Sequence, residues 1–378
     1  MSWDVPLTSL VITEEDVEAV LDCMRSGWLT MGPRTQDFET AFGEWMGSTN
    51  ALSVSSGTAA LHLALAGLGV GPGDEVIVPN LTFVATAACA RFVGATPVVA
   101  DILAPQVPLL DPEDVARRIT PRTKAVVAVH LFGYPADVAA LRRLCDEHGL
   151  ALVEDCAQGI GARLDDQGTL AGRVGDVGTF SLFSKNQLAV GEGGLLVTER
   201  DDVAERVRTL RSHAMTTGTW DRHRGHALTY DVVDVGFNFR LDEPRAALGL
   251  ARLSRLDDDI QARRGLARRY RAAFADLNGG IELMFDDAAG EQSSHFAFTV
   301  LLPDRERRDA FRESLREQGV QTTWYPALTD LTEYSAFGPA PIGVQAAHRH
   351  CAIPMSASLD GAAEARVMDA VRNAAHAA

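Results

Sequence analysis

One lysine is conspicuous because this chain uses arginine almost everywhere else. Only Lys124 and Lys185 are lysines among the 35 Lys and Arg side chains. Lys185 follows the strand-like run 178–183 and precedes the glycine-rich turn 191–194. A lysine amine can form a Schiff base with an aldehyde, whereas a guanidinium stays protonated and cannot. Lys185 is therefore a candidate nucleophile, and the alternative is a lysine on a surface loop.

Two more polar side chains follow the apolar strand-like run 151–154. In an open parallel sheet, residues just beyond the carboxyl ends of strands face the ligand crevice. Asp155 at that point could pair with a ring nitrogen and keep it protonated, and Gln158 could donate to an oxygen of the same ring. The alternative for Asp155 is a helix N-cap, since Asp is one of the preferred capping residues.

Small residues at 53–58 lead directly into a helix-like apolar stretch. Free backbone N–H groups at a helix N-terminus form an anion site, and Gly57 and Thr58 would start that helix. A phosphate monoester would fit there, although the motif taken alone favours a simple Ser/Thr cap. Phe83 follows another strand-like run, 75–79, and could stack on a ring or pack in the core.

These candidate residues together match the requirements of one cofactor. A phosphate cradle, a carboxylate for a pyridinium nitrogen, a Gln for a ring hydroxyl and an amine for an aldehyde are what pyridoxal 5'-phosphate requires. The sequence therefore predicts a pyridoxal phosphate site.

Short apolar runs alternate with amphipathic stretches through the first two thirds of the chain. Strands are predicted at 75–79, 96–100, 125–129, 151–154, 178–183 and 194–198, with a helix at 138–148. Several runs are continuously apolar, as in strands buried on both faces. This alternation predicts an α/β fold with a mostly parallel sheet covered by helices.

The pattern changes after residue 235. A long helix is predicted at 244–277, then a strand at 294–302, a helix at 304–318, a strand at 320–325 and a last helix from 361. These elements predict a smaller α+β C-terminal domain. The expected division is an N-terminal segment at 1–12, a large domain at 13–245 and the small domain at 246–378.

Composition excludes several other classes. Apolar residues make up 46% and charged residues 23%, as in an ordinary globular protein. The net charge is 35 − 51 = −16, which argues against a partner that is nucleic acid or an anionic membrane. Five separated cysteines without a CxxC pair disfavour a disulfide framework or a structural zinc site. No signal peptide or membrane span is expected, so a cytoplasmic location is predicted.

The chain resembles the sugar aminotransferases of the DegT/StrS family, which are fold-type-I pyridoxal phosphate enzymes. The motifs that carry the resemblance occur in the family's order along nearly the whole chain: Arg25-Ser26-Gly27-Trp28, Ser56-Gly57-Thr58-Ala59-Ala60-Leu61, Glu154-Asp155-Cys156-Ala157-Gln158, Ser184-Lys185-Asn186 and Gly236-Phe237-Asn238-Phe239-Arg240. The resemblance implies a large domain with a seven-stranded sheet and a smaller C-terminal domain, as in aspartate aminotransferase.

The resemblance also implies roles for individual residues. Lys185 matches the lysine that holds the cofactor and moves protons. The remaining matches are Asp155 for the ring nitrogen, Gln158 near the ring hydroxyl, Phe83 for stacking, Gly57, Thr58 and Ser181 for the phosphate, and Asn238 for the phosphate of the neighbouring subunit's cofactor. A homodimer with shared active sites is therefore expected.

The spacing around the lysine departs from the family pattern. In that pattern the Ser of Phe-Ser lies five residues before the lysine, whereas Ser181 lies four residues before Lys185. An ungapped alignment places Asn186 at the lysine position. Some relatives carry His there and act as sugar dehydratases. We interpret the spacing as a compensated shift, because the Ser-Lys-Asn order is kept.

The resemblance implies amino transfer from a donor, expected to be L-glutamate, to a nucleotide-linked 4-keto-6-deoxyhexose, expected to be dTDP-linked. The amino sugar would serve a secondary metabolite or a surface glycan. The alternatives are a dehydratase of the same family, a 3-keto sugar aminotransferase and a cofactor-binding regulatory protein. A Rossmann dehydrogenase is disfavoured because no G-x-G-x-x-G follows a first strand.

The arginine- and histidine-containing region 211–226 could meet the substrate's diphosphate or be a solvated loop. His223 and His226 resemble a metal pair, but the sequence offers no third ligand nearby. No metal is predicted.

Overall fold

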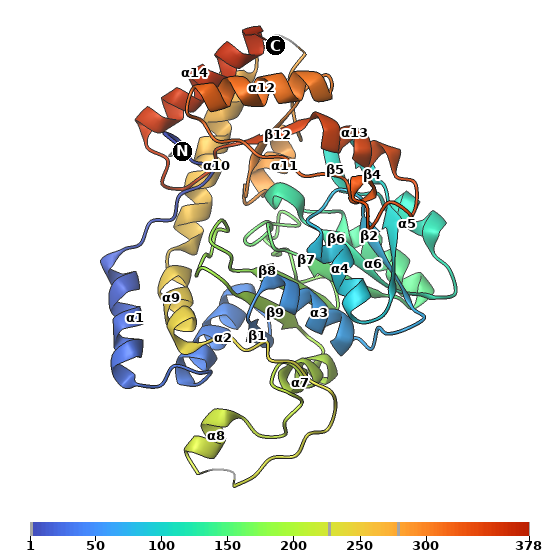
Figure 1. The fold of residues 1–378 in the computed structure, drawn as a ribbon, viewed down its shortest axis with the longest axis vertical. Helices are drawn as coiled ribbons and strands as arrows, with labels where there is room; N and C mark the ends of the chain where they lie inside the picture. Colours follow the sequence, from blue (N-terminus) through green and yellow to red (C-terminus); the bar gives the residue numbers. More distant parts are fainter. Residues whose placement is uncertain (1–2, 226–227, 278–279, 378) are drawn as a thin grey trace.

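The computed structural model of the chain describes residues 3–225, 228–277 and 280–377. A seven-stranded sheet lies at its centre, with the order β1-β9-β8-β7-β6-β2-β3 (Figure 1). β2, β3, β6, β7 and β8 are parallel, and β9 runs antiparallel to both of its neighbours. The predicted mostly parallel α/β sheet is thus confirmed. The strands are β1 (Asn50–Val54), β2 (Glu75–Pro79), β3 (Thr96–Ala100), β6 (Thr123–Val129), β7 (Ala151–Asp155), β8 (Val177–Ser181) and β9 (Gly194–Thr198).

Helices cover both faces of this sheet, which explains the continuous apolar runs. Val76 and Val78 pack into a core with α3, α4 and α7, whereas Ile77 between them packs into the opposite core with α5 and α6. Successive side chains of a strand point to opposite faces, so a strand covered on both sides must be apolar throughout. These helices are α3 (Gly57–Gly67), α4 (Ala85–Phe92), α5 (Pro112–Arg118), α6 (Val138–His148) and α7 (Asp201–Leu210).

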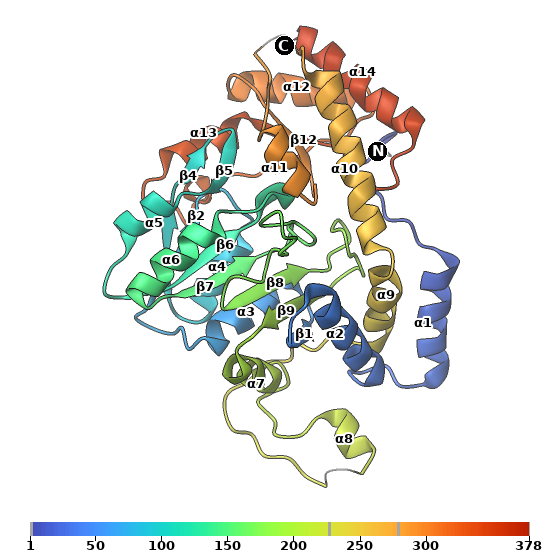
Figure 2. The same cartoon turned by 180° about the vertical axis from the view of Figure 1, so that it is seen from behind.

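The half of the second face next to β1 is covered by a different set of helices. Phe38 and Phe42 of α2 pack with Phe180 of β8 and with residues of the two helices that lead to the small domain, α9 and α10. Figure 2 shows α2 and α9 at this end of the sheet and α5 and α6 at the other. The helices are α1 (Glu14–Ser26), α2 (Pro33–Met46), α8 (Thr219–His223), α9 (Glu243–Leu253) and α10 (Leu256–Phe274).

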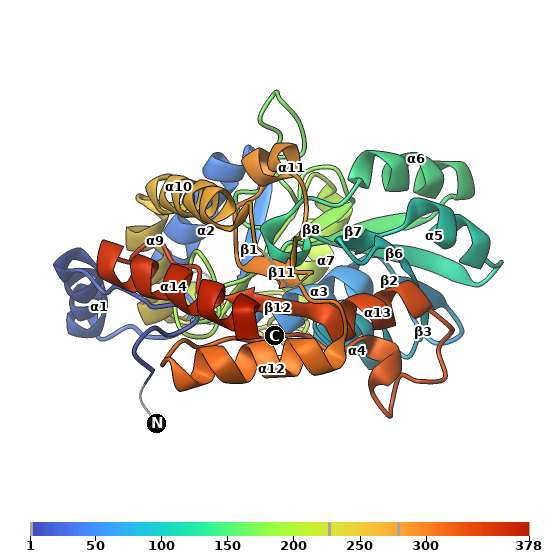
Figure 3. The same cartoon turned by 90° about the horizontal axis from the view of Figure 1, so that it is seen from above.

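The C-terminal part builds a second core on a three-stranded antiparallel sheet. The sheet has the order β10-β11-β12, and α10, α12 and α14 pack on it. Figure 3 shows α12 and α14 side by side above this sheet. α10 belongs to both parts, because Ile260 packs in the α2 core and Tyr270 in the C-terminal core. The remaining elements are β4 (Ile102–Ala104), β5 (Val107–Leu110), β10 (Glu282–Leu283), α11 (Asp287–Gln292), β11 (Phe298–Leu301), α12 (Arg305–Glu317), α13 (Pro341–Arg349), β12 (His350–Ile353), α14 (Gly361–Ala377) and the 3-10 turns Leu131–Gly133 and Leu328–Asp330.

Two predicted elements differ from the structure. The single helix predicted at 244–277 is wrong: the chain forms α9 and α10, and the helix breaks between them at Arg255, whose backbone leaves the helical region while that of Ser254 stays within it. The predicted strand at 320–325 is also wrong, because Val320 and Thr323 make only single bridges, to Val5 and Ala352. Val5 of the N-terminal segment bridges Val320, outside the three-stranded sheet, and packs in the C-terminal core.

The residue bounds of the expected division, 1–12, 13–245 and 246–378, stay a prediction. Within the described ranges, we find no helix with both the length and the apolar content needed to cross a bilayer.

Candidate active site

The strands bring the predicted site residues to one edge of the large sheet. β1 runs in the same direction as β2, β7 and β8, so all four end at that edge. A cavity of about 480 Å³ lies there, between the large sheet and the C-terminal part. Seven of the eight predicted residues line it: Gly57, Thr58, Phe83, Asp155, Gln158, Ser181 and Lys185.

Asp155 ends β7 and is 5% exposed. Its carboxylate accepts hydrogen bonds from the Thr86 hydroxyl (2.8 Å) and from the backbone N–H of Ala157 (3.1 Å). Burial raises the pKa of Asp155, although these two hydrogen bonds act in the opposite direction. Asp155 caps no helix, so its alternative role as an N-cap is wrong. The carboxylate is instead a buried acceptor that a cationic N–H in the cavity would stabilise.

The segment after β1 forms a cradle without side-chain bulk. Ser56 caps α3, its hydroxyl accepting from Ala59 N (3.0 Å), and Gly57 and Thr58 form the first turn. A Cβ built on Gly57 would lie 2.7 Å from the Cβ of Ser181. Only glycine therefore fits where the end of β8 crosses the start of α3. The first N–H groups of a helix lack intrahelical acceptors, so the cap and the anion site coexist here.

Phe83 and Gln158 lie on other walls of the cavity. Phe83 is 56% exposed although it is a large apolar residue, so its alternative role in core packing is wrong. An exposed ring on a cavity wall suits stacking against a planar ligand. Gln158 is held at both ends of its amide: Oε1 accepts from Phe132 N (2.8 Å), and Nε2 donates to the Tyr325 hydroxyl (3.3 Å).

Lys185 and its neighbour Asn186 both line the cavity but differ in exposure. Lys185 is exposed, whereas Asn186 is 9% exposed. The Asn186 side chain donates through Nδ2 to the carbonyls of Ala157 and Ser181, each at 2.8 Å. The structure thus brings the predicted lysine to the cavity, and it buries the neighbouring Asn186 more than Lys185.

Asn238 is the one predicted residue that does not line the cavity. It is exposed and makes a single bridge with Ser212. Its neighbour Phe239 accepts a backbone hydrogen bond from Ser55 N (2.8 Å), which ties this segment to the start of α3. Asn238 therefore lies outside the cavity of its own chain, on the segment that returns from the projecting α8 loop (Figure 1).

The described part of the arginine- and histidine-containing region, residues 211–225, does not line this cavity. Arg211 is 5% exposed, and its Nη1 donates to Glu39 and to the Ser53 carbonyl, so it has a structural role. The His223 ring packs 4.5 Å from the ring of Trp28. His226 of the considered metal pair lies outside the described residues.

Several site residues carry no recognisable sequence signal. Thr86 and Tyr325 contact Asp155 and Gln158, yet Thr86 lies inside α4 and Tyr325 comes from the distant C-terminal part. Glu192 also lines the cavity. Position after a strand end identified Asp155, whereas Tyr325 reaches the site only through tertiary packing.

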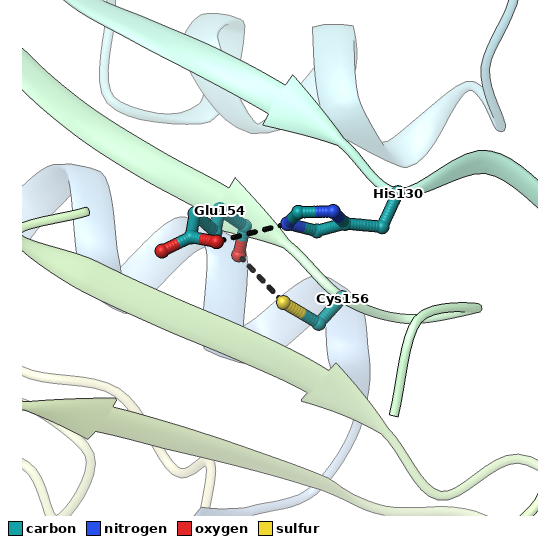
Figure 4. Close-up of side chains that lie close together, drawn as sticks. All are labelled: His130, Glu154 and Cys156. Atoms are coloured by element: carbon teal, nitrogen blue, oxygen red, sulfur yellow. Dashed lines mark hydrogen bonds and ion pairs between the residues drawn. The ribbon is translucent and has the colours of Figure 1, made fainter. Parts of the chain in front are cut away.

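His130, Glu154 and Cys156 form a buried cluster next to Asp155 (Figure 4). Their side chains are of types that bind metals, and their ligand atoms lie close together. His130 Nδ1 accepts from Ala136 N (3.1 Å), so its Nε2 carries the proton and donates to Glu154 Oε2 (2.9 Å). No imidazole lone pair is left for a metal. The other contacts of Glu154 are backbone N–H groups: Gly172 (2.8 Å), Val174 (2.7 Å) and Gly175 (2.6 Å). Burial acts to raise the pKa of Glu154, but the His130 and backbone hydrogen bonds outweigh it and hold that pKa below its usual range. This cluster fixes the end of β7, directly before Asp155.

The cavity fits pyridoxal phosphate in three respects. A buried carboxylate with a raised pKa suits the protonated ring nitrogen, a side-chain-free helix start suits the phosphate, and an exposed aromatic side chain suits the ring face. The amine comes from Lys185 on the cavity wall.

Comparisons with known proteins agree with this fit. The model of the DegT/DnrJ/EryC1/StrS aminotransferase family matches residues 11–372. The GDP-perosamine synthase of Vibrio cholerae is 37% identical over 344 residues, which are 88% of this chain and 89% of that protein. The crystal structure of the aminotransferase TlmJ from Streptoalloteichus hindustanus has a TM-score of 0.90 at 34% identity and covers 99% of both chains.

The cofactor is present in a further solved structure. NtdA from Bacillus subtilis, with bound cofactor PMP, has a TM-score of 0.85 at 28% identity over 97% of this chain and 83% of that one. A fold-type-I architecture, a cavity suited to the pyridoxal group and a family match along 11–372 lead to one assignment: the chain belongs to the DegT/DnrJ/EryC1/StrS aminotransferase family and uses pyridoxal 5'-phosphate.

Proposed function

We propose that this chain transfers an amino group from L-glutamate to the keto carbon of a nucleotide-linked 4-keto-6-deoxyhexose. The product is an amino sugar for a secondary metabolite or a surface glycan. The first candidate for the nucleotide is dTDP, and GDP is the second, because a relative is a GDP-perosamine synthase. A 3-keto sugar is the alternative acceptor. The product analysis described below distinguishes it from a 4-keto sugar, because both kinds of keto sugar are offered to the enzyme.

One observation carries the proposal. Seven residues predicted from scattered motifs line a single cavity, and the buried Asp155 and the exposed Lys185 are both among them. Four different strand ends contribute to it. Such a convergence of an acid, an amine and an anion cradle supports pyridoxal-type chemistry more than any one motif does.

When bound, pyridoxal phosphate supplies a carbonyl that carries the amino group between substrates and a ring that takes up electrons. The chain's own residues do the rest. Asp155 holds a proton at the ring nitrogen, and Lys185 moves a proton at the carbon next to the transferred nitrogen. Gly57 and Thr58 hold the phosphate, Phe83 orients the ring, and donor and acceptor bind in turn at the same cavity.

The direct test is product analysis with a panel of keto-sugar nucleotides. Purified enzyme is incubated with pyridoxal phosphate, L-glutamate and each sugar, and products are identified by mass spectrometry. We expect an amino sugar together with 2-oxoglutarate, and loss of both in Lys185→Ala. Lys124→Ala is the matched control, since Lys124 is exposed in β6, away from the cavity. Amino sugar formation by Lys185→Ala would remove Lys185 from the mechanism.

A second candidate is a dehydratase of the same family. The exposure of Lys185 and the burial of Asn186 favour it, because a lysine on an exposed turn is less confined for proton transfer than a buried one. The same panel separates the two activities, since elimination releases water and leaves the sugar without nitrogen. A sugar product that lacks nitrogen would favour the dehydratase.

We also propose a homodimer with shared active sites. The loop that carries Asn238 projects from the body (Figure 1), and its apolar side chains are exposed: Leu228, Tyr230, Val232, Val233 and Val235. Exposed apolar side chains gathered on one arm are typical of an interaction surface. A second copy that covers this arm would place Asn238 against the neighbouring cofactor's phosphate.

Mixing two inactive variants tests the shared site. Lys185→Ala and Asn238→Ala are each prepared alone and then mixed under conditions that exchange subunits. A heterodimer contains one site with both native residues, so we expect the mixture to regain activity. Sedimentation gives the oligomeric state of each sample. A dimeric mixture without regained activity would contradict the sharing of Asn238.

The cysteines support a reducing compartment, and we propose the cytoplasm. All five are free and buried in the structure.

A further inference from the structure

The segment after β8 places two neighbouring residues at different depths of the cavity. Phe183, Ser184 and Lys185 are consecutive exposed residues, and Asn186 follows as a buried one. The backbone N–H of Asn186 donates to the Phe183 carbonyl (2.8 Å), which closes a tight turn. We call the exposed side of the cavity its rim and the side formed by Asp155 and Ala157 its floor.

The Asn186 carboxamide lies at the floor. Its Nδ2 donates to Ala157 O and Ser181 O, and Ala157 N in turn donates to the Asp155 carboxylate. Ala157 thus links Asn186 through hydrogen bonds to Asp155, the residue proposed to hold the ring nitrogen. Asn186 also joins the ends of β7 and β8, the two strands that carry Asp155 and Ser181.

A carboxamide at this position cannot act as the nucleophile that forms a Schiff base with an aldehyde. Its nitrogen lone pair is delocalised into the carbonyl, and both Nδ2 hydrogens are used by the two backbone carbonyls. A lysine at residue 186 would start from the same backbone position but is longer, so its amine could extend past these two carbonyls into the cavity that residue 186 lines. The chain has an asparagine at this position.

We propose that Asn186 occupies the floor position from which an amine would reach the cofactor's aldehyde carbon, so that Lys185 can reach that carbon only from the rim. This inference rests on the proposed function for the identity of the ligand. Asn186 is then a positioning residue that holds the turn carrying Lys185.

The position of Lys185 affects the covalent link between its amine and the aldehyde. In forming it, the Lys185 nitrogen lone pair adds to the aldehyde carbon, and the carbonyl oxygen leaves as water. The reverse reaction consumes water, and a link made at an exposed rim is open to it. Retention of the cofactor therefore depends on Asp155 and on the phosphate cradle at Gly57 more than on the lysine.

Reductive trapping tests where the amine must lie. Wild type, Lys185→Ala, Asn186→Lys, the double variant Lys185→Ala/Asn186→Lys and the control Lys124→Ala are saturated with pyridoxal phosphate. Borohydride then converts any carbon–nitrogen link into a stable secondary amine, and peptide mapping locates the added mass. With two lysines in the native chain, an unambiguous assignment is possible.

We expect the double variant to carry the added mass at residue 186. We also expect Asn186→Lys to lose the cofactor more slowly than wild type on dilution, while Lys124→Ala loses it at the wild-type rate. A double variant that binds the cofactor, as its absorbance shows, but carries no mass at residue 186 would overturn the inference. Slower loss in Lys124→Ala as well would also count against it.

Two further measurements keep the test decisive. If Asn186→Lys does not fold, Lys185→Ala/Asn186→Cys is folded first and alkylated with 2-bromoethylamine, which installs a lysine-like amine at residue 186. The five native cysteines are buried and none of them lines the cavity, whereas residue 186 does, so the reagent can reach the introduced thiol through the cavity. Mass at residue 186 but none at Lys185 in wild type supports the floor assignment and removes Lys185 from the proposed mechanism. Trapping at residue 186 without any amino sugar formed by wild type supports this inference and refutes the proposed function.

Discussion

The Glu154→Gln substitution gives a loss of stability that can be worked out from the structure. Glu154 is fully buried, and each carboxylate oxygen accepts two hydrogen bonds. Oε2 faces His130 Nε2 and Gly172 N, and Oε1 faces Val174 N and Gly175 N. All four partners are donors. A glutamine keeps one oxygen, so its NH2 group must face one of the two donor pairs.

Two donors therefore lose their acceptor in Glu154→Gln. A hydrogen bond to a charged acceptor contributes about 1.5–3 kcal/mol, so the loss is about 3–6 kcal/mol. Removal of the buried charge offsets part of this, and we expect a net loss of about 3 kcal/mol in the free energy of unfolding. Because domains are stable by only about 5–15 kcal/mol, urea unfolding followed by tryptophan fluorescence will detect it.

The matched control is Glu147→Gln, an exposed position on α6. It should change the free energy of unfolding by less than about 0.5 kcal/mol. A loss below about 1 kcal/mol in Glu154→Gln would refute the reasoning. It would mean that His130 does not donate to this carboxylate or that the backbone N–H groups find other acceptors.

The difference in the free energy of unfolding between wild type and Glu154→Gln should depend on pH. The pKa of Glu154 is lowered in the folded state, so its contribution is present above the ordinary pKa of a glutamate. That contribution is lost as the pH falls through the lowered, folded-state pKa. The stability difference between wild type and Glu154→Gln should therefore shrink in acid. A difference that grows in acid would contradict the sign of the shift.

Three further substitutions test the cavity walls. Gly57→Ala should weaken cofactor binding in absorbance titrations, because its Cβ would lie 2.7 Å from the Cβ of Ser181; unchanged affinity would contradict a cradle there. Phe83→Ala should lower cofactor affinity by about 0.5–1.5 kcal/mol while the unfolding midpoint stays constant, since the ring is 56% exposed. Asp155→Asn should make the cofactor-free protein at least as stable at neutral pH, because burial raises the pKa of Asp155 and its ionised form costs stability as the pH rises. The same variant should lower kcat strongly with cofactor still bound, and an unchanged kcat would rule out its role at the ring nitrogen.

Local pattern predicted the large sheet well because its strands are short apolar runs with clear ends. The runs 75–79, 96–100 and 194–198 coincide with β2, β3 and β9. β1 was not predicted as a strand, because Asn50–Val54 mixes polar and apolar residues and is held by pairing with β9. Pairing partners far apart in the chain leave no local signal.

The small domain was predicted less accurately for the same reason. The run 320–325 has strand-like residues, yet it meets its neighbours only at Val320 and Thr323. β12 lies at residues 350–353, where no strand was predicted, and forms the edge of the three-stranded sheet. Tertiary contacts, rather than propensity, decide which of these segments becomes a strand.

The site shows the limit of one-dimensional spacing most clearly. Position after a strand end was enough to identify Asp155, and a helix start was enough for Gly57. Spacing could not decide which of Lys185 and Asn186 lies deeper, since a turn of four residues can present either one. Burial and two hydrogen bonds, visible only in three dimensions, distinguish them.

α10 limits how the two halves of the enzyme can move. Its first turns are buried with α2 through Ile260, and its later turns with the C-terminal core through Tyr270. A swing of one half against the other would have to bend this helix or expose one of these packed surfaces. We therefore expect substrates to enter at the exposed side of the cavity, where Phe183 and Lys185 lie, rather than through a hinge motion between the two halves.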